Sequence, residues 1–212
     1  MVVAILNPKG GTGKTTLATN LSRSLQAWGD VLLLDLDPQQ SAQEWAERNP
    51  ADYPGVLGVQ PENLLRTIPK VKDRFGTIVI DGAAIMGQRS LTDAIKAADF
   101  ILIPVQPSGL DIWGVSDLVE LIKTRQGITD GQPKASFVVS RQIQGTRFAA
   151  DIQTRLEQME MPVFASRLTQ RIDFTEAATA GLSVLDYRPR GKAAEEIKAI
   201  TNELRRFINA ES

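Results

Sequence analysis

The sequence contains no cysteine and no histidine. Without cysteine, the chain can form no disulfide, no zinc ribbon and no cysteine-ligated iron–sulfur cluster, and it has no thiol nucleophile. Without histidine, it has neither an imidazole ligand for a metal nor a histidine general base. Acid–base and metal chemistry must therefore depend on Asp, Glu, Lys, Ser, Thr or Tyr.

Long apolar runs and an excess of one charge are absent as well. No apolar stretch approaches the roughly 20 residues that a membrane-spanning helix needs. The apolar start at residues 2–6 is too short for a secretory signal and follows no basic segment. Lysine and arginine together number 24, against 25 acidic residues, and this balance argues against a strongly basic nucleic-acid binder. We expect a cytoplasmic protein with no membrane partner.

Short apolar runs alternate with longer amphipathic segments, a pattern typical of a parallel sheet flanked by helices. We predict strands at residues 2–6, 31–34, 77–80, 100–104 and 136–139, with weaker ones at 162–165 and 183–185. We predict helices at residues 14–28, 41–48, 91–97, 114–125, 147–159, 170–180 and 192–208, and a surface loop at 49–61. With 212 residues and no evident linker or repeat, residues 1–212 are expected to form one α/β domain.

A glycine-rich loop separates the first predicted strand from the first predicted helix. It reads Lys9-Gly10-Gly11-Thr12-Gly13-Lys14-Thr15-Thr16. Glycines let backbone N–H groups converge on an anion, and the start of the following helix adds partial positive charge. Lys14 is placed to reach the β- and γ-phosphates, and the Thr15 hydroxyl to ligate Mg²⁺. The loop therefore predicts a site for ATP or ADP with Mg²⁺; the alternative is a turn that serves only tight packing.

Carboxylates follow two other predicted strands. Asp35 and Asp37 come after the run 31–34, and Asp81 comes after the run 77–80. The carboxyl ends of parallel strands face the crevice in which such sheets bind ligands. The apolar strand that ends in Asp81 has the shape of a Walker B motif, so we expect Asp81 to hold Mg²⁺ through a water molecule.

Lys9 makes the loop more specific than an ordinary phosphate loop. The pattern K-G-G-x-G-K-[ST] is the deviant Walker A motif, and together with Asp35-Leu36-Asp37-Pro38-Gln39 it resembles the ParA/MinD family of ATPases, in particular the short ParA type. The resemblance covers nearly the whole chain. It implies a three-layer α/β/α P-loop NTPase fold with a mostly parallel twisted sheet.

The same resemblance implies roles for individual residues. Lys9 reaches across a face-to-face homodimer to the nucleotide of the other subunit, whereas Lys14 acts within its own subunit. Asp37 positions the attacking water, and Asp35 helps to hold the magnesium shell. An ordinary carboxylate is a weak base at neutral pH, so orientation of the water is favoured over proton abstraction. We expect slow hydrolysis.

Two later segments also resemble parts of the family. Arg141, after the run 136–139, matches the position of a purine-contacting residue, although an ordinary surface arginine explains it nearly as well. Pro107 and Asp111 follow the run 100–104 and lie close to the partner subunit if the resemblance extends to the dimer face. A strand with its turn accounts for the same residues.

A group of basic residues in the last third of the chain suggests contact with DNA phosphates. Arg167 and Arg171 lead this group, whose other members are Arg188, Arg190 and Lys192. A patch of this kind on a dimer suffices for nonspecific binding, because each contact is made twice. No module that reads bases is evident. The alternative is a solvated face.

The terminal segment carries apolar residues at helical spacing but mixes acidic and basic side chains on its polar face. Packing against the sheet is therefore favoured over the membrane contact of MinD-like proteins. The resemblance implies an ATP-dependent dimerising switch for plasmid or chromosome partition, nucleoid-associated with ATP bound, whose hydrolysis is stimulated by a ParB-like or centromere-binding adaptor. The alternatives are positioning of a protein cargo, such as a carboxysome or chemoreceptor cluster, and a MinD-like membrane cycle.

Overall fold

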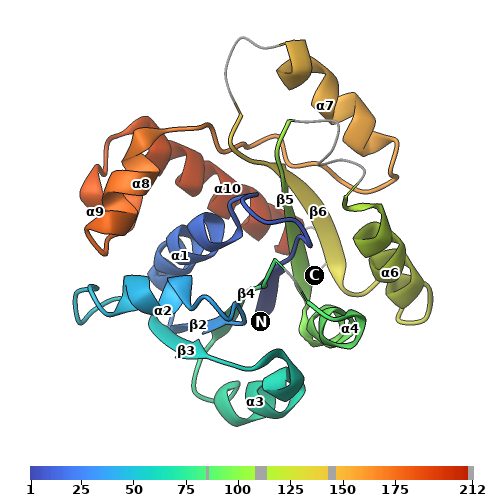
Figure 1. Ribbon diagram of the computed structural model, residues 1–212, viewed down its shortest axis with the longest axis horizontal. Helices are drawn as coiled ribbons and strands as arrows, with labels where there is room; N and C mark the ends of the chain where they lie inside the picture. The colour runs from blue at the N-terminus through green and yellow to red at the C-terminus, as the bar shows by residue number, and fades with distance from the viewer. Residues whose placement is uncertain (85, 108–113, 143–146, 210–212) are drawn as a thin grey trace.

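The computed structural model describes residues 1–84, 86–107, 114–142 and 147–209. Within these ranges a parallel sheet of six strands has the order β3-β2-β4-β1-β5-β6 (Figure 1). The strands are β1 Val2–Ile5, β2 Val31–Asp35, β3 Gly55–Gly58, β4 Thr77–Asp81, β5 Phe100–Val105 and β6 Lys134–Val139. Every pair of neighbouring strands is parallel. The predicted fold class is confirmed.

Helices cover both faces of this sheet. One face carries α1 Lys14–Leu25, α2 Ser41–Ala46, α8 Ile172–Thr179, α9 Val184–Tyr187 and α10 Lys192–Asn209. The other face carries α3 Leu64–Val71, α4 Gln88–Ala97, α6 Ser116–Gly127 and α7 Arg147–Glu157. Two single turns of 3-10 helix, η1 Gln26–Trp28 and η2 Pro61–Asn63, complete the described elements.

The strands are apolar throughout because both of their faces are buried. In β1, Val2 and Ala4 belong to the hydrophobic core under α3, α4 and α6. The alternate residues Val3 and Ile5 belong to the core under α1 and α10. A parallel sheet covered on both sides needs apolar residues at every position, which explains why the sequence shows continuous runs rather than alternation.

The terminal helix α10 packs into the core, as the sequence favoured. Ile197, Ile200 and Leu204 are buried in the core that α10 shares with α1. The ring of Phe207 lies 5.7 Å from that of Phe164 and 6.2 Å from that of Phe100. The apolar face of this amphipathic helix is therefore occupied. No described helix is both long and apolar enough to cross a bilayer.

Three local predictions were wrong. The expected loop at 49–61 contains β3, an edge strand whose mostly exposed residues and terminal glycines resemble a loop in the sequence. The weak strand at 183–185 is replaced by the start of α9, because the Ser183 hydroxyl accepts a hydrogen bond from the N–H of Leu185 and caps that helix. The weak strand at 162–165 is reduced to one parallel bridge, between Phe137 and Val163. Helix α3 was not foreseen.

The packing of α10 predicts the effect of truncating Ile200, which has no exposed surface. Ile200→Ala should lower the free energy of unfolding by about 2–5 kcal/mol, because it removes buried methyl groups and leaves a cavity. The matched control is Ile128→Ala, at a side chain that is 75% exposed, and we expect a change within about 0.5 kcal/mol there. Urea denaturation measures both. Equal stability of the two variants would contradict the buried position of α10.

Candidate functional site

The phosphate loop lies at the centre of the sheet. It joins β1 to α1, and β1 pairs with β4 on one side and with β5 on the other. Connections leave β1 and its neighbours toward opposite faces here, which opens the crevice where parallel sheets bind ligands. Gly11 and Gly13 have φ angles of 77° and 88°, a left-handed conformation that favours glycine. The predicted loop thus has the backbone form that its glycines require.

Polar side chains tie the loop to the strands around it. The buried Asn7 amide donates to the carbonyl of Pro104 at 2.8 Å, and its oxygen accepts the N–H of Lys9 at 2.8 Å. From the end of β6, the buried Ser140 hydroxyl donates to the Thr12 carbonyl at 2.6 Å. These bonds fix the loop before any ligand arrives.

Arg141 also contacts the phosphate loop. It follows β6 in a left-handed conformation with a φ of 51°, and its guanidinium donates to the Gly11 carbonyl at 2.9 Å. The same carbonyl accepts the side-chain amide of Gln106 at 2.5 Å. The ends of β5 and β6 therefore hold the outer part of the loop, and Arg141 lies at the site as the sequence suggested.

Lys14 is held inside the loop. Lys14 is only 6% exposed, and its ammonium donates a hydrogen bond to the Lys9 carbonyl at 2.8 Å. Burial lowers the pKa of Lys14, while the negative charges of Asp81 and Asp37 act in the opposite direction. The negative charge of a phosphate bound by the loop would be favourable next to this cation.

Asp81 is the most unusual group of the site. It is fully buried at the end of β4, and neither of its oxygens has a hydrogen-bonding partner of acceptable geometry among the described residues. Burial raises the pKa of Asp81 to about 7, with the nearby Thr15 hydroxyl and the Lys14 ammonium acting in the opposite direction. A hard cation with oxygen ligands would satisfy this carboxylate. Thr15 and Asp81 therefore fit a Mg²⁺ ion.

Asp35 lies next to Asp81, because the register of β2 and β4 pairs the two residues. Its oxygens accept three backbone N–H groups, from Asp37 at 3.0 Å, Ala42 at 3.0 Å and Gln43 at 3.2 Å. Burial raises the pKa of Asp35, and these hydrogen bonds partly counteract that rise. Asp35 thus holds the start of α2 and the loop that carries Asp37. Asp37 itself is half-buried and accepts the N–H of Gln39 at 2.9 Å.

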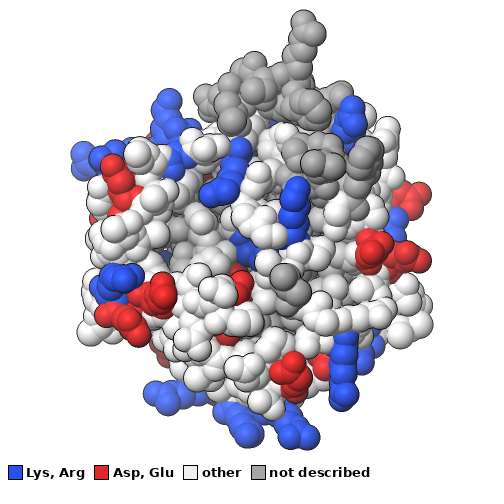
Figure 2. All heavy atoms as spheres, in the orientation of Figure 1, with Lys and Arg blue, Asp and Glu red and all other residues white. Residues whose placement is uncertain are grey.

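A cavity of about 630 Å³ opens beside the loop. Gly13 and Thr16 form one wall and Arg141 another, while the remaining wall comes from residues 168–172 and from α8. Figure 2 shows this face of the molecule hollowed near its centre, with lysine and arginine side chains at the rim. The position beside the phosphate loop and the size fit the nucleoside part of a nucleotide.

The wall at residues 168–172 is held in place by a carboxylate of α10. Glu196 accepts the N–H and the hydroxyl of Thr169, at 3.0 and 2.6 Å, and two guanidinium nitrogens of Arg171, at 2.9 and 2.8 Å. Two turns further along α10, Glu203 accepts the N–H groups of Ala165 and Ser166 at 2.7 and 2.8 Å. Helix α10 therefore helps to shape a cavity of which another wall is formed by Gly13 and Thr16 of the phosphate loop.

These contacts also bear on the predicted DNA patch. Arg171 is paired with Glu196, and Arg188 is paired with Asp173 and Glu176. Arg167 donates to the side chains of two glutamines. The positive charges of Arg171 and Arg188 are thus balanced by carboxylates within the protein.

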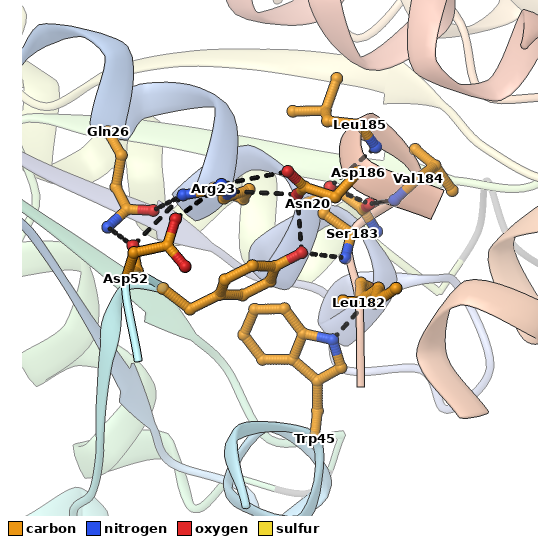
Figure 3. A network of polar contacts seen from close by, with 11 residues as sticks. Asn20, Arg23, Gln26, Trp45, Asp52, Leu182, Ser183, Val184, Leu185 and Asp186 are labelled. Atoms are coloured by element: carbon orange, nitrogen blue, oxygen red, sulfur yellow. Dashed lines mark hydrogen bonds and ion pairs between the residues drawn. The ribbon is translucent and has the colours of Figure 1, made fainter. Parts of the chain in front are cut away.

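A second network fixes the segment after α8 to α1 (Figure 3). Asn20 donates to the Thr16 carbonyl at 2.8 Å, and its side-chain oxygen accepts the Ser183 hydroxyl and the Val184 N–H, both at 2.9 Å. Asn20 thereby connects the first turn of α1 with the start of α9. The helix α8, which lines the cavity, is held at a fixed distance from the phosphate loop.

Asp186 extends this network. It accepts hydrogen bonds from the Arg23 guanidinium at 3.0 Å and from the Tyr53 hydroxyl at 2.6 Å, and Arg23 also pairs with Asp52 at 3.2 Å. Burial and the adjacent Asp186 raise the pKa of Tyr53 to about 12. Three segments far apart in the sequence are joined here, as Figure 3 shows.

The structure brings most of the predicted site residues together at one edge of the sheet. These are Lys9, Gly10, Gly11, Thr12, Gly13, Lys14, Thr15, Thr16, Asp35, Asp37, Asp81 and Arg141. Pro107 is half-buried after β5, and Asp111 lies outside the described residues. Sequence reasoning missed the supporting roles of Asn7, Asn20, Ser140 and Glu196. Their signal is a buried or partly buried polar side chain that bonds to a distant segment, and it exists only once the fold is known.

Known proteins share these elements. The profile of the family described as the CobQ/CobB/MinD/ParA nucleotide binding domain matches residues 3–184. Maintenance of carboxysome distribution protein A from Halothiobacillus neapolitanus is 31% identical over 207 residues, 95% of either chain. The chromosome-partitioning ATPase Soj from Thermus thermophilus is 26% identical, over 95% of this chain and 94% of its own. The solved structure of the septum site-determining protein MinD with Mg-ADP, from Pyrococcus horikoshii, shares the fold with a TM-score of 0.77 at 18% identity, covering 100% of this chain and 98% of that one.

The raised pKa of Asp81 predicts a pH-dependent stability difference between the wild type and Asp81→Asn. Between about pH 4 and pH 7 the folded protein keeps a proton on Asp81 that the unfolded chain releases. The free energy of unfolding of the wild type therefore falls as the pH rises through this window. Asp81→Asn lacks this loss. From pH 5 to pH 8 its melting temperature should therefore rise relative to that of the wild type, by about 2–4 °C for each kcal/mol of unfolding free energy that the wild type loses.

Thermal unfolding without nucleotide or Mg²⁺ measures this difference, and a constant difference at both pH values would contradict it. Adding Mg²⁺ with ADP at pH 8 should stabilise the wild type more than Asp81→Asn.

The contacts of Glu196 predict a selective loss of nucleotide affinity. Glu196→Gln should loosen residues 169–171 and raise the Kd for ATP about tenfold, which corresponds to roughly 1.4 kcal/mol. The Kd for inorganic tripolyphosphate, which needs only the phosphate loop, should stay unchanged. The matched control is Glu203→Gln, whose partners lie outside the cavity lining. Calorimetric titration measures the affinities of both variants for ATP and for tripolyphosphate, relative to the wild type. If Glu196→Gln loses affinity equally for both ligands, the substitution causes a general structural defect instead.

Proposed function

The chain belongs to the CobQ/CobB/MinD/ParA family of nucleotide-binding domains, and from this premise we propose that it is a Mg·ATP-dependent dimerising ATPase of the ParA type that distributes a cargo along DNA. One arrangement supports the proposal. A single phosphate loop carries two lysines, Lys9 and Lys14, and lies beside the buried carboxyl group of Asp81, which has no hydrogen-bonding partner in the described part of the chain. An ordinary phosphate loop has only the second lysine. The additional lysine is what a loop serving two subunits requires.

The phosphate loop and the cavity divide the nucleotide between them. The backbone N–H groups from Gly10 to Thr16 bind the phosphates, and the Lys14 ammonium lies against the β- and γ-phosphates. Thr15 and Asp81 hold Mg²⁺, which neutralises charge on the transferring phosphoryl group when bound. The adenine occupies the cavity beside Arg141 and the wall that Glu196 holds.

Hydrolysis depends mainly on positioning. Asp37 orients the attacking water, because it is the carboxylate of the pair whose side chain remains half-exposed. Asp35 accepts the backbone N–H of Asp37 and so fixes the position of that residue, and it adds its charge to the magnesium shell. Lys9 reaches the nucleotide of the partner subunit, so each active site is complete only in the dimer. Turnover is slow until an adaptor protein stimulates it.

The cargo that we favour is a protein assembly. The relative named for carboxysome distribution is 31% identical and aligns over 95% of both chains, whereas the chromosome-partitioning relative is 26% identical. Partition of a plasmid or chromosome, which the sequence put first, is the second candidate, supported by that relative. A ParB-like or comparable adaptor connects the ATPase to the cargo in either case.

DNA supplies the track in both candidates. The ATP-bound dimer binds duplex DNA without sequence preference and is nucleoid-associated, and hydrolysis releases it. A MinD-like membrane cycle is disfavoured, because the apolar face of α10 packs into the core of the protein.

Light scattering combined with DNA retention tests this proposal. We expect the wild type to dimerise and to bind a nonspecific duplex with ATP, but not with ADP or without nucleotide. Asp37→Ala should form a longer-lived ATP dimer, because the water is no longer oriented. The matched variant Lys9→Ala should bind ATP and stay monomeric. If Lys9→Ala dimerises like the wild type, the action of Lys9 across the dimer is refuted, and absence of DNA binding in every state refutes the DNA track.

A further inference from the structure

A second basic surface lies on the other side of the molecule from the pairs at Arg171 and Arg188. Helix α3 and the turn after it carry Arg66, Lys70, Lys72 and Arg74, all exposed; we call these four residues the α3 surface. Figure 2 shows lysine and arginine side chains along the lower edge of the molecule, where α3 lies in Figure 1.

The charges of the α3 surface are not balanced locally. Residues 64–75 contain four basic side chains and a single acidic one, Asp73. Within the described ranges, none of the four forms an ion pair with a carboxylate, in contrast to Arg171 and Arg188. Arg74 instead lies with its guanidinium 5.6 Å from the centre of the Phe75 ring. Positive charge is therefore available to a partner here.

The turn that carries these side chains is well fixed. Leu64 and Ile68 anchor α3 in the core, and the turn continues with hydrogen bonds from the N–H of Lys72 to the Ile68 carbonyl at 2.9 Å and from the N–H of Arg74 to the Val71 carbonyl at 3.0 Å. A rigid backbone loses little conformational entropy when its side chains meet a charged partner.

We propose that the α3 surface contacts the phosphate backbone of duplex DNA. DNA presents a regular array of negative charge that matches a cluster of unpaired lysines and arginines. A lipid surface fits less well, because Leu64 and Ile68 are buried in the core and leave Leu65, which is 42% exposed, as the one large exposed apolar side chain of α3, too little for an apolar face that inserts between lipids. This inference rests on the DNA track proposed above and assigns it a location.

The same location explains why DNA binding depends on ATP. Four charges on one subunit give weak attachment, whereas a dimer presents two such surfaces on one body. Linking two weak sites raises the overall affinity far above that of either, without any new contact. No residue of the α3 surface lines the nucleotide cavity, so the surface can act without disturbing the ATP site.

A charge-neutralised variant tests the inference. Arg66→Gln, Lys70→Gln, Lys72→Gln and Arg74→Gln are combined in one protein, and its binding to a nonspecific duplex with ATP is measured over a range of salt concentrations. We expect at least about a tenfold loss of affinity at low salt. The slope of log K against log[salt] should become shallower by about 3 to 4 for each subunit in contact, since each lost phosphate contact contributes about 0.9.

The matched control combines Arg190→Gln and Lys192→Gln, from the group of basic residues that the sequence singled out. It should keep the slope of the wild type. Unchanged melting temperature and basal ATP hydrolysis establish that both variants are folded.

Each outcome decides between the two proposals. If the wild type binds DNA and the neutralised α3 variant binds equally well, the α3 surface is not the contact, and the DNA track stands. If the control loses the binding instead, the contact lies near α9 and α10. If the wild type binds no DNA in any nucleotide state, the DNA track fails and the inference with it. A third result would also overturn the inference: the wild type binds vesicles of equal parts phosphatidylglycerol and phosphatidylcholine, the α3 variant does not, and neither protein binds DNA. The partner of the α3 surface would then be a membrane.

Discussion

A carboxyl group buried without a hydrogen-bonding partner is costly, and among the residues that the structure describes such a group lies at the end of β4, in the middle of the site. Asp81 lies at the centre of the sheet, next in register to Asp35 and close to the Lys14 ammonium. Its burial follows from the same packing that makes β4 apolar on both faces, and burying a charge in such a place lowers stability. A cation held by Asp81 would offset this cost. Ligand affinity and stability would then be connected through a single group.

The polar contacts around the loop come from distant parts of the chain. Residues 9–16 form the phosphate loop itself, while Asn20 in α1 and Glu196 in α10 hold the walls of the adjacent cavity. Neither Glu196 nor Asn20 needs to touch a ligand to matter. Their hydrogen bonds join segments that are far apart in the sequence, and they fix α8 and residues 168–172 around the cavity.

Much of the fold and the centre of the site could be predicted from the sequence, because both depend on local patterns. Continuous apolar runs identify buried parallel strands, and the spacing of Lys9, Gly13 and Lys14 identifies a phosphate loop. The errors have physical causes. The edge strand β3 is paired on one side only and is too exposed to show an apolar run. The short helix α9 is determined by a cap and by contact with Asn20, which lies 163 residues before Ser183 in the chain. Charge pairing at Arg171 depends equally on the folded structure, because Glu196 is 25 residues away.

The clamp at Glu196 has a consequence for local unfolding. Residues 168–172, which form one wall of the cavity, are tied to α10 by the hydrogen bonds of Thr169 and Arg171 to Glu196. The phosphate loop is held instead by Asn7 and Ser140, at the centre of the sheet. Proteins open in local units as well as globally. An opening that detaches α10 releases this wall of the cavity and leaves the phosphate loop intact, so the two parts of the site can be lost separately.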